Sequence, residues 1–174
     1  MNIHKWDYWS WAYSDFLSNT NRAVFWEFLV AKALWISDSK RIEWDNVDLR
    51  YLWKKIEVKT SAYLQSWEQK WISRIQFDIA PRKKSWDSVT NIISESRGRE
   101  SDIYIFCLLE LLDKAEAIEE NILNVNNWWF YVTSTGLLNS EFPNQKSISF
   151  SKLATITKRI DFQSLKSTID LILI

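Results

Sequence analysis

Polar and apolar residues alternate most regularly over residues 54–62. Ile56, Val58 and Thr60 fall on one side of an extended chain, and Glu57 and Lys59 fall on the other. The pattern predicts a strand whose one face is apolar and whose other face carries a carboxylate and an ammonium group.

A 3.6-residue apolar period predicts a helix over residues 22–34. Glu27 interrupts its apolar face, because its neighbours three and four positions away are all apolar. A buried carboxylate is costly unless it is compensated. Glu27 is therefore either one half of an ion pair, within the helix or in the core, or a carboxylate directed at a metal ion or at Lys59.

The remaining pattern predicts further strands and a long connection. Strands are expected at 41–49, as the hairpin partner of 54–62, and then at 72–79, 102–109 and 128–133. Residues 82–101 are expected to form a polar loop with one helical turn near 89–94. Short elements are expected within 114–127 and 150–157, a loop around 136–143 and an amphipathic helix over 162–173. This order predicts one α/β domain spanning 1–174, with an antiparallel start and a parallel neighbour reached by the long connection.

Composition limits the classes of protein to consider. An apolar fraction of 47% and a charged fraction of 25% are typical of a soluble globular protein. The net charge of zero leaves no global field for nucleic acid, so such binding needs a local patch. One cysteine, Cys107, excludes an internal disulfide and a multi-cysteine zinc site. Without a signal-like segment or a run of roughly 20 apolar residues, we expect a cytoplasmic protein and no membrane partner.

Tryptophan and glycine usage is abnormal. The chain has 12 Trp and 2 Gly, whereas average usage predicts about 12 glycines in this length. Trp35 follows the last periodic residue of the first predicted helix, and Trp53 lies in the tight connection before Ile56; glycine is the usual residue at both kinds of position. Either this is an unusually Trp-rich domain, or some of these codons belong to an organism that decodes a stop codon as glycine.

Asp48, Glu57 and Lys59 are the candidate reactive groups. The predicted hairpin brings Asp48 to the strand that carries the other two. Two carboxylates can hold Mg²⁺, which polarises a phosphate and activates water, and a lysine can orient or deprotonate that water. The bare pattern is unspecific, because alternating charges on a strand usually form a solvated face.

A longer segment makes the pattern more specific. Trp44-Asp45-x-x-Asp48-Leu, then Ile-Glu-Val-Lys-Thr-Ser-Ala-Tyr-Leu-Gln-Ser-Trp over 56–67, resembles the PD-(D/E)xK nuclease superfamily, closest to a group of small, largely uncharacterised bacterial proteins. The likeness continues through Arg99-x-x-Asp102-x-Tyr104 and the aromatic run at 129–132. It implies an α/β fold with a restriction-endonuclease-like αβββαβ core, whose central mixed sheet of four to five strands is flanked by helices.

The resemblance also implies roles for individual residues. Asp48 and Glu57 would bind the metal ion, Mg²⁺ or alternatively Mn²⁺, together with the Val58 carbonyl. Lys59 would activate water, and Glu27 would be the carboxylate that some branches place on the first helix. Two departures are Val47 in place of the proline of the motif, which many active members also lack, and the tryptophans at 26 and 35, where relatives tend to have glycine.

Other residues are candidates for contact with nucleic acid. Cations of the 82–101 loop are expected to steer a phosphate backbone or simply to be solvated, and they are Arg82, Lys83, Lys84, Arg97 and Arg99. Gln65 would touch the phosphate, or cap the strand end with side-chain hydrogen bonds. Asp45 is the fallback ligand if the strand register differs.

These observations lead us to expect a Mg²⁺-dependent DNA endonuclease. The alternatives are a catalytically inactive nuclease-fold domain that binds DNA or protein, and an interaction protein that uses exposed aromatic residues. The form of the nucleic acid, duplex or branched, is open. A homodimer would suit this fold, although nothing in the chain marks a dimer face.

Overall fold

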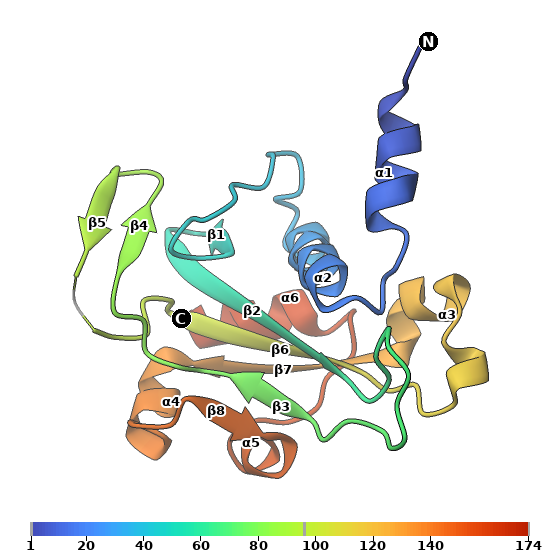
Figure 1. Ribbon diagram of the computed structural model, residues 1–174. Coiled ribbons are helices and arrows are strands. Elements are labelled where there is room, and N and C mark those ends of the chain that lie inside the picture. Colours follow the sequence, from blue (N-terminus) through green and yellow to red (C-terminus); the bar gives the residue numbers. More distant parts are fainter. Residues whose placement is uncertain (1, 96, 174) are drawn as a thin grey trace.

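The computed structural model describes residues 2–95 and 97–173, and its centre is a mixed sheet of four strands (Figure 1). The strand order is β1-β2-β6-β7. Their bounds are Leu49–Tyr51, Lys54–Ala62, Ile103–Leu109 and Trp128–Ser134. β2 runs antiparallel to β1 and parallel to β6, and β6 runs antiparallel to β7. The expected mixed sheet and its parallel neighbour are confirmed.

Both faces of this sheet are covered. Alternate residues of β6, such as Ile105 and Cys107, pack with helices α2 (Asn19–Ala33) and α6 (Leu165–Leu173). The residues between them, such as Phe106, pack with a two-stranded ribbon and two helices. These elements are β3 (Gln76–Asp78), β8 (Ser147–Ser149), α4 (Thr135–Glu141) and α5 (Phe150–Ile156). Every residue of β6 is buried, which is why its sequence is continuously apolar.

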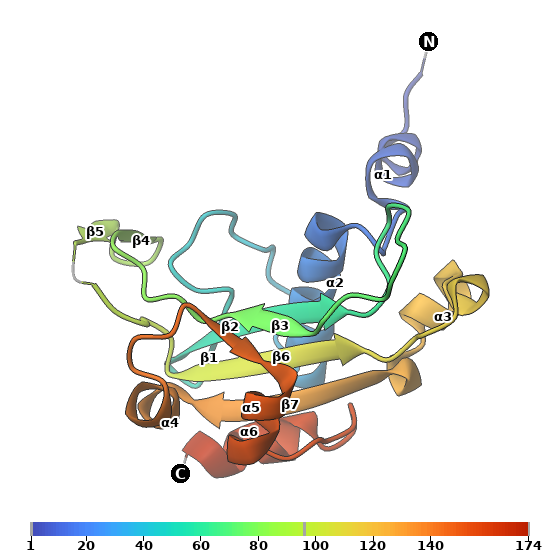
Figure 2. The same cartoon turned by 60° about the horizontal axis from the view of Figure 1, so that its bottom comes forward.

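Two described segments stand away from the sheet, as both views show (Figures 1 and 2). Helix α1 (Lys5–Tyr13) contains no buried residue. The hairpin of β4 (Ser85–Asp87) and β5 (Ile92–Ser94) forms a separate two-stranded sheet. The remaining short elements are helix α3 (Glu119–Leu123) and 3₁₀ turns at Lys114–Glu116 and Val125–Asn127.

Several local predictions are wrong for identifiable reasons. Residues 41–48 are not a strand; side-chain contacts of Arg41, Asn46 and Asp48, rather than a ladder, connect this segment to its neighbours. The third strand shrinks to β3 and pairs with β8, outside the main sheet. The polar connection holds the β4–β5 hairpin instead of a helical turn. Gly136 lies inside α4 rather than in a loop.

No helix in the described ranges is long and apolar enough to cross a membrane.

Candidate active site

The candidate site lies where β1 ends and leaves an edge of β2 without a strand partner in the described chain. β1 pairs with β2 only as far as Ile56. Asp48 continues the contact: its backbone N–H donates to the Ile56 carbonyl at 3.1 Å, and its Oδ2 accepts from the Val58 N–H at 2.7 Å. Because the N–H and C=O of one strand residue point to the same side, the Val58 carbonyl also faces this open edge.

Glu57 and Lys59 occupy the face of β2 that is turned toward β3. Glu57 is buried, and its Oε1 accepts from Lys59 Nζ and from Arg82 Nη2, both at 2.6 Å. Its Oε2 accepts from Ser101 Oγ at 3.2 Å. Glu57 is therefore held in place by two cations and a hydroxyl.

Glu27 reaches the same edge from α2, on the other face of the sheet. It is buried and forms a two-point ion pair with Arg41, in which Nε donates to Oε2 and Nη2 donates to Oε1 at 3.0 Å. Of the two alternatives, the ion pair is present, and its partner comes from the α2–β1 connection. Glu27 nevertheless lines the same cleft as Lys59.

Asp48 is the carboxylate of the site whose negative charge is least compensated. Burial, followed by the negative charges of Glu57 and Glu27, raises the pKa of Asp48 to about 7. The Val58 N–H and Lys59 act in the opposite direction but do not cancel this effect. Asp48 forms no ion pair with any residue in the described ranges. The charges of Glu27 and Glu57 thus raise the pKa of Asp48, and Asp48 is the carboxylate of the three that has no ion-pair partner among the described residues.

A cleft of about 480 Å³ opens beside these groups. Its lining includes Glu27, Asp48, Val58 and Lys59, whereas Glu57 lies behind it. Its more distant walls are mostly polar, with Ala23 and Trp67 as apolar members, and the polar residues are Asn19, Arg22, Thr60, Ser61, Gln65, Ser73, Arg74, Gln76 and Asp78. No sequence signal marks Arg22, Arg74 or Arg41 for the site, because each is brought to it from a separate segment.

The oxygen donors at this edge are of the type that hard divalent cations prefer. Among the described residues, no group of three or more His, Cys, Asp or Glu side chains is arranged to hold a metal ion. Mg²⁺ commonly needs only one or two protein carboxylates and keeps several waters. Asp48 supplies a carboxylate without a paired cation. At Glu57 and Glu27, a bound ion would compete with Lys59, Arg82 and Arg41 for the oxygens.

The residues predicted to contact nucleic acid lie in different surroundings. Lys83 and Arg97 are exposed, and Lys84 pairs with Glu95 at the surface. Arg82 is directed to Glu57, so it belongs to the site rather than to a solvated loop.

Arg99 is a correction. It is buried, and its guanidinium donates to the carbonyls of Ile79, Phe142 and Gln145 and to Asn139 Oδ1. Its side chain holds the fold together and is not presented to a nucleic acid.

Gln65 has the structural role that we gave as an alternative. Its Nε2 donates to the Ala62 carbonyl at 2.8 Å, and its main-chain carbonyl accepts from Lys114 Nζ at 2.5 Å. The side chain still lines the cleft, and its Oε1 is buried without a hydrogen-bond partner.

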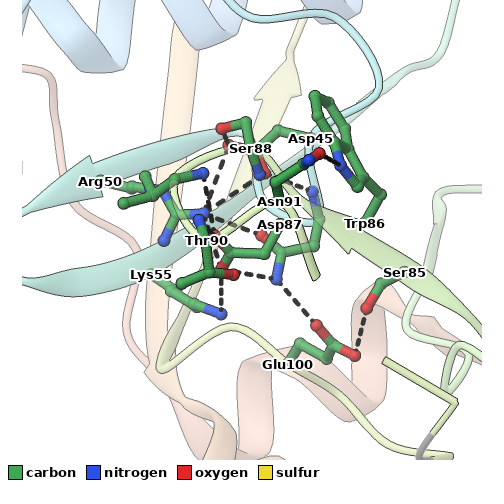
Figure 3. A network of polar contacts seen from close by, with 12 residues as sticks. Asp45, Arg50, Lys55, Ser85, Trp86, Asp87, Ser88, Thr90, Asn91 and Glu100 are labelled. Carbon is green, nitrogen blue, oxygen red and sulfur yellow. Dashed lines mark hydrogen bonds and ion pairs between the residues drawn. The ribbon is translucent and has the colours of Figure 1, made fainter. Parts of the chain in front are cut away.

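Asp45, the fallback ligand, belongs to a different network (Figure 3). It accepts hydrogen bonds from the backbone and hydroxyl of Ser88 at 3.0 and 2.6 Å and pairs with Arg50 at 3.3 Å. Arg50 and Lys55 each lie 3.1 Å from Asp87. These contacts fasten the β4–β5 hairpin to the start of the sheet.

Comparison with known proteins adds no family: no protein-family model, curated protein or solved structure matches this chain.

Proposed function

We propose that this protein is a Mg²⁺-dependent nuclease of the PD-(D/E)xK type that hydrolyses phosphodiester bonds in DNA. The observation that carries the proposal is the convergence of Glu27, Asp48 and Lys59 on one cleft, with Glu57 directly behind Lys59. The acids come from three segments of the chain. A merely solvated strand face would not gather a helix carboxylate and a loop carboxylate around the same edge.

In this proposal each side chain has a separate task. Asp48, with Glu57, Glu27 and the Val58 carbonyl nearby, would hold the divalent cation, which would supply positive charge to the phosphate. Lys59 Nζ, 2.6 Å from Glu57 Oε1, is held at the cleft wall, where it can orient an attacking water and screen charge that develops on the phosphate. Arg82 Nη2 also donates to Glu57 Oε1, so it helps to hold that carboxylate in place.

Arg74 extends the positive side of the cleft. It is exposed, lines the cleft, and forms no ion pair with any other described residue. An unpaired guanidinium beside the reactive groups suits a phosphate of the bound strand. In the proposed enzyme, Arg74 would position DNA, whereas Lys59 would act on the chemistry.

A second candidate is a nuclease-fold domain that binds DNA or protein without cleaving. Both Glu57 and Glu27 already have cationic partners, and that observation favours it. A site whose carboxylates stayed paired would keep its shape and its cationic wall while losing the metal ion.

Plasmid cleavage with and without Mg²⁺ tests the proposal. We expect nicking or linearisation by the wild-type protein that requires Mg²⁺ and is lost in Lys59→Ala. Lys152→Ala, an exposed change on α5, is the control and should leave cleavage intact. Salt-sensitive DNA binding without cleavage at matched folding would select the non-cleaving DNA-binding domain. Absence of both activities would reject the nuclease and the DNA-binding domain, and would leave the protein-binding form of the second candidate.

A further inference from the structure

Positive backbone φ angles are concentrated at tryptophan. The described residues other than glycine with positive φ are Trp35, Trp44, Leu52, Trp53 and Asn91, at 61°, 67°, 48°, 66° and 56°. Asparagine tolerates this region, but a bulky side chain rarely does, because its Cβ approaches the backbone too closely. Neither glycine of the chain has a positive φ. Tryptophan thus occupies the backbone positions for which glycine is the usual residue.

Trp35 ends α2 in a geometry that glycine normally provides. Its N–H donates to the Lys32 carbonyl at 3.1 Å, and the N–H of Ile36 donates to the Ala31 carbonyl at 2.9 Å. This pair of bonds is the Schellman motif, in which the residue after the C-cap is left-handed and is most often glycine. The Trp35 side chain contributes little burial, since 81% of the residue is exposed, and Lys166 Nζ lies 5.3 Å from its ring centroid without enclosing it.

Trp53 occupies the tight turn between β1 and β2. Tyr51 pairs with Lys54, so Leu52 and Trp53 form a two-residue loop, and both have positive φ. That geometry is the type I′ turn, whose second position strongly favours glycine. The Trp53 side chain is fully exposed, and that of Trp44 is 85% exposed. None of the three indoles is placed by core packing.

Trp26 shows a different misfit, inside the core. Its ring centroid lies 3.7 Å from that of Trp128, closer than the 4.5–7 Å that aromatic pairs prefer. Its Nε1 is buried without a hydrogen-bond partner. Trp128, by contrast, donates its Nε1 to the Ile122 carbonyl at 2.8 Å. Arg159 stacks 3.4 Å from the ring of Trp129. Trp128 shares the close ring contact, but its indole N–H has a hydrogen-bond partner, whereas that of Trp26 has none.

We infer that positions 26, 35, 44 and 53 are glycine in the native protein, encoded by a UGA codon that its organism reads as glycine, and that Trp128 and Trp129 are true tryptophans. Positive φ selects positions 35, 44 and 53, the crowded indole without a hydrogen-bond partner selects position 26, and satisfied side-chain contacts select positions 128 and 129. This inference is independent of the proposed function. It also concerns the site, because positions 44 and 53 flank the segment that carries Asp48.

The codons and the mass of the native protein test this assignment position by position. We expect UGA at the four selected positions and UGG at 128 and 129. Peptides of the protein purified from its own organism should be lighter by one Trp-to-Gly difference at each selected position. UGG codons at 35, 44 and 53, or tryptophan-containing peptides there, would overturn the inference.

A stability comparison tests the physical reason separately. The triple variant Trp35→Gly, Trp44→Gly, Trp53→Gly should melt above both the sequence as written and the matched triple alanine variant. Alanine removes the indoles but still has a Cβ, so only glycine relieves the positive φ. Equal melting temperatures for the glycine and alanine variants would show that the backbone does not require glycine. Trp128→Gly should lower the melting temperature.

Discussion

The Asp48 site and the Asp45–Asp87 network use the same residue types with opposite electrostatic results. In the network, hydrogen bonds from Thr90 and Val89 and the cations Lys55 and Arg50 hold the pKa of Asp87 well below its ordinary value. At the cleft, burial and two neighbouring carboxylates raise the pKa of Asp48 to about 7. Acidic residues that are fully paired form a structural fastening, whereas an acidic residue left without a cation is a candidate for ligand binding and chemistry.

The largest expected effect is on DNA cleavage, which should depend on Asp48 and not on Asp45. Asp48→Asn should reduce Mg²⁺-dependent DNA cleavage by roughly a hundred- to ten-thousand-fold, because it removes the carboxylate that would hold the ion. Asp45→Asn should cleave nearly as well as the wild type per folded molecule. Initial rates on supercoiled plasmid measure both. Equal losses in the two variants would show that the regions do not differ as we describe.

The second effect is on stability, where the Asp45 variant should lose more than the Asp48 variant. Asp45→Asn should lower the free energy of unfolding by about 2 kcal/mol, because it leaves Arg50 and Ser88 with a weaker partner in a half-buried network. Urea denaturation measures the change. Asp48→Asn should be neutral or stabilising at pH 8, since it removes a poorly compensated charge. A destabilised Asp48→Asn variant with an unchanged Asp45→Asn variant would contradict the assignment of the structural role to Asp45 rather than to Asp48.

The third effect is the pH dependence of that charge. A carboxyl group whose folded pKa is raised contributes stability at low pH, and this stability is lost as pH rises through the folded pKa. For Asp48 the window runs from about 4 to about 7. Without metal, we therefore expect the wild type to lose a few degrees of melting temperature, relative to Asp48→Asn, between pH 5 and pH 8. Mg²⁺ should restore more stability at pH 8 than at pH 5.

The smallest effect concerns the proposed DNA path. Arg74→Gln should weaken DNA binding several-fold and reduce the salt slope of log K by about one, as expected for the loss of one phosphate contact. Fluorescence anisotropy with Ca²⁺ in place of Mg²⁺ measures binding without cleavage. Lys70→Gln, an exposed residue of the β2–β3 connection that does not line the cleft, is the matched control. An unchanged slope for Arg74→Gln would remove Arg74 from the path.

The sequence pattern predicted the elements in which each face keeps the same surroundings along its whole length. β2 alternates because one of its faces packs on α2 and the other carries Glu57 and Lys59. β6 is continuously apolar because both of its faces are covered. Trp35 and Trp53, which the sequence placed at positions where glycine is usual, both have positive φ. These features depend on local periodicity or local backbone geometry, which the sequence carries directly.

Features that depend on distant partners could not be read from the pattern. The β4–β5 hairpin has exposed Ile92 and Ile93, so its strands lack the usual alternation between buried and exposed residues. In the sequence Arg99 looks like any other cation of a loop. Its structural role depends on the carbonyls of Ile79 and Phe142, which come from distant segments. Similarly, Arg41 has no sequence signal for its pairing with Glu27, because a loop closure brings the two together.

The short length of β1 has a consequence for solubility. A strand edge with free N–H and C=O groups invites pairing with another copy of the chain, and natural proteins protect such edges with charges or irregular covering. Asp48 occupies the Val58 N–H that an incoming strand would need, and Lys59 places a charge nearby. The same carboxylate therefore guards the sheet against edge-to-edge aggregation. This role of Asp48 is independent of the proposed metal binding.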